Sequence, residues 1–412
     1  MTVQNRIPAA AEAARVPAPG ARKRKRALRR TATFGTAALG AALAAALASP
    51  ALAAVAQPVN AHLGFGGGSD RAVFVQTDNT AGNEIIAYAR SASGTLTEAG
   101  AYPTGGLGGQ TGGSVADHLS SQGSLALDRA AGVLVAVNAG SNTIAVFSVH
   151  GDTLRLEQVI GSGGTFPVSV TIRGDLAYVL NAENGGSVQG FRITPGGFVQ
   201  LPGSNRELGL DPTLTPQFVN TPGQVAFSPD GRQIIVTTKA NGNDIDVFAV
   251  RADGGLSATP TVNSEPGTVP FGIAFDPAGD LVIANAGTNT LTTFALKPSG
   301  TVTPLATAAT GQSATCWVTA SRDLLFAGNA GSSSESVFED GPAGSLTAVG
   351  NPVSTDAGTI DSAASPTGRF LYIQTGVSGI VDEFTVSRAG GLTEIGSVTV
   401  PGGGGDEGIV VG

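Results

Sequence analysis

Few side chains in this chain suit acid–base chemistry. Histidine occurs only as His62, His118 and His150. His118 directly follows Asp117 in a glycine-rich stretch over residues 105–123, and a carboxylate beside an imidazole is a common arrangement for a general base. We therefore predict that His118 and Asp117 are catalytic, with the carboxylate orienting the ring. The alternative interpretation is a histidine in a surface loop.

Four further polar side chains stand at the start of short apolar segments, where they would gather if these segments converge: Gln224, Asp361, Asp406 and Glu407. We predict that they bind the substrate. Paired carboxylates would also suit a cation held by oxygen ligands, and solvated loop acids are the alternative. Cysteine and histidine form no cluster with metal-ligand spacing, and no glycine-rich loop opens a helix. The sequence thus predicts no cofactor and no metal centre.

The N-terminal segment differs in composition from the rest of the chain. A basic block at Arg22–Arg30 precedes an Ala/Gly/Leu run, and Ala51–Ala53 provides a small-x-small cleavage motif. This order is typical of a bacterial signal peptide over residues 1–53, with cleavage near Ala53. Export by the Sec route is one reading, and Arg29-Arg30 indicates the twin-arginine route as the other. We expect a secreted, extracellular protein with no membrane span in the mature chain.

Loss of this segment would make the protein strongly acidic. Residues 1–53 hold nine of the 23 Lys and Arg but only one acid, which leaves 14 basic and 30 acidic residues and a net charge of −16. Such a charge disfavours nucleic acid and anionic lipid as partners. Cys316 is the only cysteine, so no internal disulfide can form, and we expect it to be buried.

A short repeated phrase indicates which elements position these side chains. A turn followed by one apolar residue occurs seven times along the chain, at spacings of 58, 44, 58, 46, 44 and 46 residues. The apolar residues are Leu96, Leu154, Phe198, Leu256, Val302, Leu346 and Leu392. A period of 40–50 residues built from short strands predicts the blades of a β-propeller.

Each repeat reads as four strands. A first strand rich in small residues ends in a Pro/Asp/Gly turn, as in QVAFSPDG at 224–231 and GIAFDPAG at 272–279. An apolar second strand, an alternating third strand and the turn phrase with a fourth strand follow. The third strand carries an aromatic residue that should pack between blades. Six of these are Phe147, Phe191, Phe248, Phe294, Phe338 and Phe384.

The two ends of the repeat region complement one another. AVFVQ near Arg71 is a second-type strand without a first strand before it, and EGIVV at Glu407–Val411 is a first-type strand with nothing after it. We predict an all-β, seven-bladed β-propeller with four-stranded antiparallel blades, closed by the C-terminal strand completing the first blade. The domains are then the signal peptide, a flexible lead at 54–69 and the propeller at 70–412.

The turns between second and third strands carry a further signature, as in VAVNAGSNTIAVFSV at 135–149 and VIANAGTNTLTTFAL at 282–296. Together with SPDG, they resemble the lactonase-type seven-bladed propellers, which include 6-phosphogluconolactonase-like, muconate-lactonising and YVTN-type proteins. Enzymes of that group share an Arg-His pair at the start of an inner strand and a Glu after the next strand. Here the pair falls on Gly223-Gln224 and the strand ends in TTKAN, so the family's catalytic set is not matched.

Two functions follow from these observations. The resemblance implies a secreted lactonase that hydrolyses or isomerises a small lactone at the channel mouth. The missing Arg-His pair favours a non-catalytic extracellular propeller that binds a ligand or protein partner on its channel face. In either case we expect a monomer whose partner is a small molecule or an extracellular protein.

Overall fold

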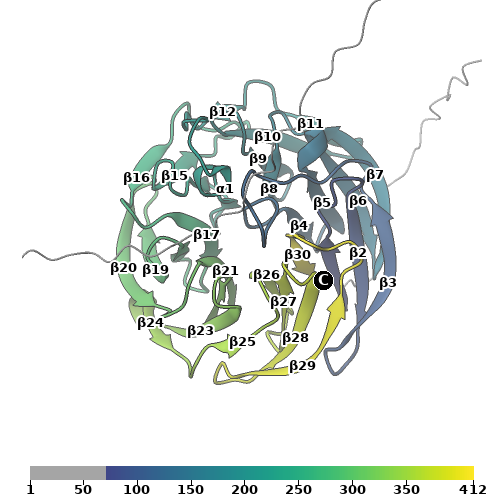
Figure 1. Cartoon of the computed structure of the whole chain (residues 1–412). Helices are drawn as coiled ribbons and strands as arrows, with labels where there is room; N and C mark the ends of the chain where they lie inside the picture. Colours follow the sequence, from purple (N-terminus) through teal and green to yellow (C-terminus); the bar gives the residue numbers. More distant parts are fainter. Residues whose placement is uncertain (1–70) are drawn as a thin grey trace, which may run out of the picture. The chain divides into compact units, whose positions relative to one another are not determined.

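The computed structural model describes residues 71–412, which form a ring of seven antiparallel sheets around a central axis (Figure 1). The predicted segments 1–53 and 54–69 lie outside the described residues. No helix in the described part is long and apolar enough to cross a bilayer. The predicted all-β propeller with seven blades is confirmed.

The blades are numbered in chain order, and each has four strand positions from the axis outward. The inner strands of blades 1 to 7 are β30 (Ile409–Val411), β4 (Leu125–Asp128), β8 (Pro167–Arg173), β13 (Val225–Phe227), β17 (Pro270–Phe275), β21 (Thr315–Ser321) and β26 (Thr359–Ala364). The second strands are β1 (Ala72–Gln76), β5 (Val133–Asn138), β9 (Leu176–Asn181), β14 (Gln233–Thr237), β18 (Leu281–Asn285), β22 (Leu324–Asn329) and β27 (Phe370–Thr375).

The third strands are β2 (Glu84–Arg90), β6 (Thr143–His150), β10 (Ser187–Thr194), β15 (Asp244–Ala249), β19 (Thr290–Leu296), β23 (Ser334–Gly341) and β28 (Ile380–Val386). The outer strands are β3 (Leu96–Pro103), β7 (Thr153–Gly161), β11 (Gly197–Gln200), β16 (Thr261–Ser264), β20 (Val302–Ala309), β24 (Ser345–Ala348) and β29 (Leu392–Thr399). Three short helical turns lie in connections: η1 (Ala139–Ser141), α1 (Gln217–Asn220) and η2 (Pro342–Gly344).

The ring closes as the sequence predicts. β30 pairs antiparallel with β1 through Val73↔Val411, Phe74↔Val410 and Val75↔Ile409. The last strand of the chain thus supplies the inner strand of blade 1, and the C-terminus lies beside the first described strand (Figure 1).

The outer strands depart from the predicted pattern in three blades. In blades 3 and 6 the outer position is split, because β12 (Arg206–Glu207) and β25 (Val353–Ser354) also pair with the third strand. In blade 4, Leu256 forms only an isolated bridge with Val250, and β16 begins at Thr261. Outer strands face solvent on one edge, so interruptions there cost little packing.

Apolar side chains between neighbouring sheets form the core. All six third-strand phenylalanines are at most 2% exposed, which confirms their predicted place between blades. Each fully buried phenylalanine contributes about 2–3 kcal/mol of transfer free energy. Cys316 is buried and free, as expected. The asparagines of the second-to-third turns, among them Asn142 and Asn289, adopt left-handed backbone angles with φ of 56° and 54°.

Candidate functional site

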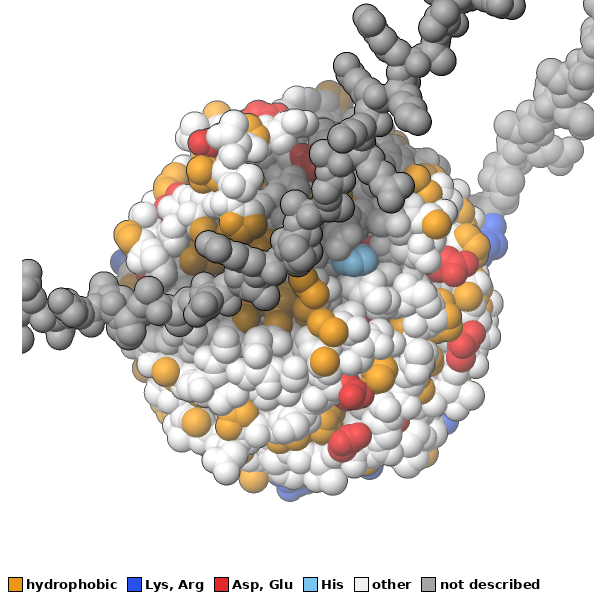
Figure 2. Space-filling model, viewed as in Figure 1, with side chains coloured by type: hydrophobic (Ala, Val, Ile, Leu, Met, Phe, Trp, Pro, Cys, Tyr) orange, Lys and Arg blue, Asp and Glu red, His pale blue; other side chains and the backbone are white. Residues whose placement is uncertain are grey.

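One end of the central channel is closed by the connection between β3 and β4. Residues 105–124 of this connection, here called the plug, reach across the axis to blade 6. The Gln122 side chain donates to Val318 O at 2.7 Å and accepts from Val318 N at 3.1 Å, and Trp317 Nε1 donates to Ser121 O at 2.8 Å. This glycine-rich stretch therefore passes near one mouth of the channel. Figure 2 draws one face of the ring, on which the visible lysine and arginine side chains lie at the rim.

A buried lysine links the plug to the connection that precedes β13. Lys239, after β14, is 1% exposed, and its Nζ donates to Ser120 O, Phe218 O and Thr221 Oγ1 at 2.6, 2.7 and 2.9 Å. Burial lowers the pKa of Lys239 to about 7, against the opposing effect of the Asp117 carboxylate. Three neutral acceptors hold this ammonium group, so its main contribution is to fix the backbone around the mouth.

Asp117 organises the plug from within. Its Oδ1 accepts hydrogen bonds from the amides of Leu119 and Ser120, and its Oδ2 accepts one from Ser121, each at 2.8 Å. Burial raises the pKa of Asp117 to about 7, and these three amide donors oppose that rise. The carboxylate is thus engaged by its own loop.

His118 lies beside Asp117 in sequence but is not paired with it. No hydrogen bond among residues 71–412 joins the two side chains, and His118 Nδ1 is buried without a partner there. The His118 backbone amide donates to Gly405 O at 2.9 Å, and burial lowers the pKa of the ring. The expected orientation of His118 by Asp117 is absent from this structure, and their catalytic roles stay predictions.

The predicted binding residues Asp361 and Glu407 meet at the axis below the plug. Glu407 Oε1 accepts from Gly123 N at 2.8 Å, and the Asp361 and Glu407 carboxyl groups are in hydrogen-bonding contact. Burial raises the pKa of Asp361 to about 7 and raises that of Glu407 well above its ordinary value, where the charges of Asp117, Asp361 and Asp78 add to the effect. Two carboxyl groups in such contact disfavour ionisation of both at once.

The other two predicted binding residues serve the ring itself. Asp406 is fully buried, and its Oδ2 accepts a hydrogen bond from Gln374 Nε2 at 3.1 Å. Gln224 Oε1 accepts from Ile273 N at 2.5 Å, which links the inner strands of blades 4 and 5. These contacts connect Asp406 and Gln224 to neighbouring strands. Their role in substrate binding stays a prediction.

The opposite end of the channel is open. A cavity of about 400 Å³ lies among the far ends of the inner strands of blades 1, 2, 6 and 7. Its lining is Leu127, Arg129, Thr319, Ala320, Ser321, Ser362, Ala363, Ala364, Ser365, Pro366, Ile409, Val410 and Val411. Asp361 lies directly behind this wall, because its carboxylate accepts the amides of Ser362, at 2.9 Å, and Ile409.

Sequence reasoning missed two buried ionisable groups near the axis. Lys239 is one of only two lysines beyond residue 53, and this scarcity was the available signal. Glu335 is fully buried with no partner for either carboxyl oxygen among the described residues, and burial raises its pKa well above the ordinary value. Glu335 occupies the third-strand position that holds Ile144 in blade 2 and Leu291 in blade 5. An acid at a position that is otherwise aliphatic was therefore the signal by which the sequence could have revealed it.

The remaining candidates lie away from the axis. His150 is exposed at the end of β6, and His62 lies outside the described residues. Within residues 71–412, no three His, Cys, Asp or Glu side chains form a ready metal-binding set.

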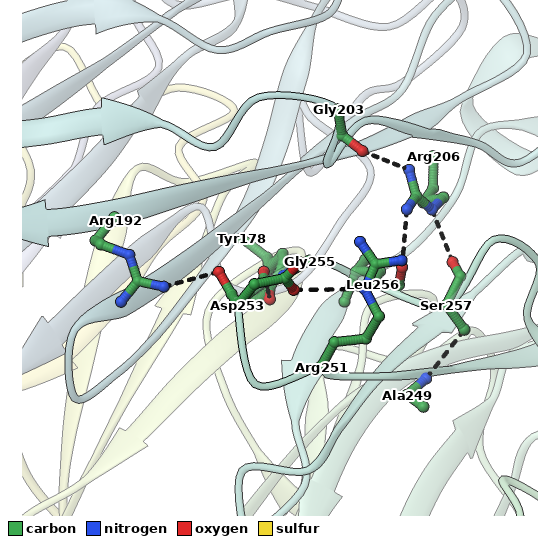
Figure 3. Close-up of polar contacts among 11 residues, drawn as sticks. Tyr178, Arg192, Gly203, Arg206, Ala249, Arg251, Asp253, Gly255, Leu256 and Ser257 are labelled. Atoms are coloured by element: carbon green, nitrogen blue, oxygen red, sulfur yellow. Dashed lines mark hydrogen bonds and ion pairs between the residues drawn. The ribbon is translucent and has the colours of Figure 1, made fainter.

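Arg192, Arg206 and Arg251 of blades 3 and 4 lie close together, but they bind protein groups (Figure 3). Arg206 donates to the carbonyls of Gly203, Leu256 and Ser257, and Arg192 donates to Asp253 O. These guanidinium groups are used to hold the wide outer loop of blade 4 against blade 3.

Comparisons with known proteins agree with this architecture. Residues 173–319 match the family described as Lactonase, 7-bladed beta-propeller. A search among curated proteins finds no match. Similar solved structures include a putative 6-phosphogluconolactonase from Bacteroides fragilis, with 19% identity, a TM-score of 0.66, and coverage of 82% of this chain and 97% of that chain. A periplasmic gluconolactonase from Pseudomonas aeruginosa has 18% identity, a TM-score of 0.64, and coverage of 82% and 98%.

Identities below 20% support the fold alone, whereas the family match extends from the inner strand of blade 3 to that of blade 6. The chain is thus a closed ring of seven blades, of which residues 173–319 resemble the lactonase-type seven-bladed β-propellers.

Proposed function

We propose that the protein hydrolyses a small uncharged lactone bound in the axial cavity at the open mouth. The observation that carries this proposal is the buried Asp361 carboxylate, which accepts the amides of Ser362 and Ile409 directly behind the cavity wall. The family match adds support for lactone chemistry. Export, as predicted from residues 1–53, would place the reaction outside the cytoplasm.

Asp361 would supply both the base and the acid step. In its carboxylate form it takes a proton from a water molecule, whose oxygen attacks the lactone carbonyl carbon. As the ring C–O bond breaks, Asp361 gives this proton to the leaving alkoxide oxygen, so one water is consumed and the carboxylate is restored. Glu407 stays buried between Asp361 and the plug and acts as a positioning residue. A pKa of about 7 for Asp361 suits this cycle at neutral pH.

The uncharged nature of the substrate follows from the local charge. Asp78, Asp117, Asp361 and Glu407 influence one another electrostatically, and Lys239 is the one lysine close enough to offset Asp117. An anionic lactone would have to approach this acidic group, which is unfavourable, and the Arg129 guanidinium in the cavity lining already donates to Val411 O. A phosphorylated lactone is therefore expected to be a poor substrate.

A second candidate function is binding without catalysis at the same mouth. Asp361 is only 4% exposed, and the cavity wall consists mainly of hydroxyl-bearing and small side chains. Such a wall can hold a polar ligand through hydrogen bonds without any reaction. This is the alternative expected from the missing Arg-His pair.

Hydrolysis of a panel of non-phosphorylated lactones by residues 54–412 tests the proposal. The Asp361→Asn variant should lose about 100-fold or more in kcat, the usual contribution of a general base. The control is Asp230→Asn, which removes an exposed aspartate from the turn between β13 and β14 of blade 4. This variant should keep full activity.

Three results would contradict the proposal in different ways. Turnover lost in His118→Ala but kept in Asp361→Asn would place the site at the plugged mouth. Ligand binding in the cavity with no turnover would establish the binding function instead. A protein that neither turns over nor binds any lactone would remove the proposal altogether.

A further inference from the structure

The basic residues of this acidic chain are unevenly distributed around the ring. Four of the 14 lysine and arginine residues beyond residue 53 lie at the seam where blade 7 meets blade 1. In blade 1 they are Arg71, directly before β1, and Arg90, the last residue of β2. In blade 7 they are Arg369, directly before β27, and Arg388, two residues after β28. We call these four residues the seam arginines.

One aromatic ring holds two of the seam arginines together across the seam. The Arg90 Cζ atom lies 5.5 Å from the centroid of the Phe370 ring, and the Arg369 Cζ atom lies 5.3 Å from it. The attraction between a guanidinium group and an aromatic face offsets part of the repulsion between two like charges. Because Phe370 is only 2% exposed, both guanidinium groups are held against a fixed part of the protein.

Backbone contacts place the other two seam arginines nearby. Arg71 O accepts a hydrogen bond from Arg90 N at 2.6 Å, and Arg369 O accepts one from Val386 N at 2.8 Å, two residues before Arg388. Arg71, Arg369 and Arg388 are exposed, whereas Arg90 is half-buried. Two blades thus present a cluster of guanidinium groups to solvent at one place.

The seam lacks the acid that accompanies an arginine at the same position of another blade. Arg369 follows the turn SPTG, as Arg232 follows the turn SPDG in blade 4. Asp230 of the blade 4 turn pairs with Arg232 at 3.9 Å, but Thr367 stands in its place in blade 7. The repeat therefore keeps the arginine here and omits its counter-ion.

No other carboxylate fills this role in the part of the chain that the structure describes. There, the guanidinium groups of Arg71, Arg369 and Arg388 take part in no ion pair and no hydrogen bond. Glu383, which reaches across the same seam from β28, is 2% exposed and accepts a hydrogen bond from Leu96 N at 2.9 Å. Converging positive charge without a protein counter-ion favours a bound anion.

We propose that the seam arginines bind a phosphate group. Guanidinium groups donate paired hydrogen bonds to phosphate oxygens, and a tetrahedral phosphate can receive them from several directions, whereas a carboxylate offers two oxygens in one plane. The site is independent of the proposed function, because the lining of the axial cavity contains none of the four residues. A ligand held by both blades would also reinforce the closure of the ring at β1 and β30.

Isothermal titration of residues 54–412 with sodium pyrophosphate tests the site, with thermal unfolding as a second measurement. We expect one site per chain and a rise of about 2–4 °C in Tm at about 100 times the Kd. Arg369→Gln combined with Arg388→Gln should weaken binding by about tenfold or more, because charge-assisted hydrogen bonds are lost. The matched control combines Arg155→Gln with Arg232→Gln, which removes two exposed arginines from blades 2 and 4 and should preserve binding.

A second titration, with a synthetic poly(glycerol phosphate), distinguishes the sources of the phosphate. Tighter binding per phosphate by the polymer would assign the site to a phosphate-bearing polymer, and equal binding would assign it to a free phosphate, so both results support the site. Sodium chloride at matched ionic strength controls for screening. Equal weakening by the control pair and the seam pair would overturn the proposal, as would no binding by the wild-type chain at millimolar pyrophosphate.

Discussion

The two mouths of the channel are built from the same inner strands, yet they differ in almost every physical property. At the plugged mouth, side chains and backbone of residues 105–124 bond to the inner strands, and carboxylates with raised pKa values lie fully buried. At the open mouth, small and hydroxyl-bearing side chains surround a cavity of about 400 Å³.

The ionisable groups therefore lie near one mouth of the channel, whereas the space for a ligand lies at the other. The buried polar network at the plugged mouth is satisfied largely by backbone groups, which makes it a structural closure. The open mouth offers room for a ligand, and Arg129 is the one ionisable residue in the lining of its cavity. Asp361 and Glu407 connect the two, because they contact the plug on one side and the cavity wall on the other.

Removal of the last strand should produce the largest effect, because it disrupts both mouths. Deletion of residues 406–412 takes away β30 together with the Glu407 contacts to the plug, and it exposes the edge of β1. We expect loss of cooperative unfolding across the whole domain, measured by urea denaturation with circular dichroism. The Val410→Thr variant keeps the strand and should cost no more than about 1 kcal/mol. A truncated chain that unfolds cooperatively would show that the ring does not depend on closure.

The plugged mouth should also govern the dependence of stability on pH. Asp117 and Asp361 have pKa values raised to about 7, so the folded state binds more protons than the unfolded state between about pH 4 and 7. The free energy of unfolding therefore falls with rising pH there, by about 1.4 kcal/mol per pH unit for each such group. Lys239, with its pKa lowered to about 7, binds fewer protons when folded, so its own contribution to stability rises above pH 7 and opposes that of the buried acids Glu407 and Glu335, whose pKa values are raised well above the ordinary one.

Urea denaturation from pH 4.5 to 9 should thus give a free energy of unfolding that falls from pH 4.5 to 7. Asp361→Asn should flatten the slope below pH 7, whereas Asp230→Asn, at an exposed carboxyl whose pKa is lowered by its hydrogen bond to Ser228, should not. A stability that climbs steadily from pH 4.5 to 7 would contradict the assignment of raised pKa values to these buried acids.

The smallest expected effect comes from unseating the plug alone. A methyl group on Gly376 would lie 1.8 Å from Ala116 O, so Gly376→Ala must displace the plug. We expect a cost of about 1–3 kcal/mol and faster amide exchange in residues 105–124, followed by hydrogen–deuterium exchange mass spectrometry. Gly82→Ala, whose methyl group would meet nothing within 4 Å, is the matched control. Unchanged exchange in Gly376→Ala would mean that the plug does not depend on this contact.

Much of the fold could be predicted because its determinants are local and periodic. The turn phrases and the small-residue first strands recur once per blade, the third-strand phenylalanines recur in six of the seven blades, and their spacing indicated seven blades. The unmatched strands at the two ends of the repeat region then required ring closure. The interrupted outer strands were missed, since outer positions face solvent and carry a weak pattern.

The site was harder to predict because its contacts are not periodic. The neighbours Asp117 and His118 suggested a pair, but the backbone turns so that Asp117 serves three amides instead. Lys239 gave no motif at all, and its partners lie 119 and 18 residues away at Ser120 and Thr221.

The sequence by itself determined the number of blades, their order and the closure of the ring, because each blade is specified by residues close together in the chain. Only the tertiary structure decided which mouth is closed and which buried carboxyl groups come together beneath the plug. The physical reason is that these outcomes depend on the path of irregular loops and on charges brought together from distant blades, and burial then sets their protonation.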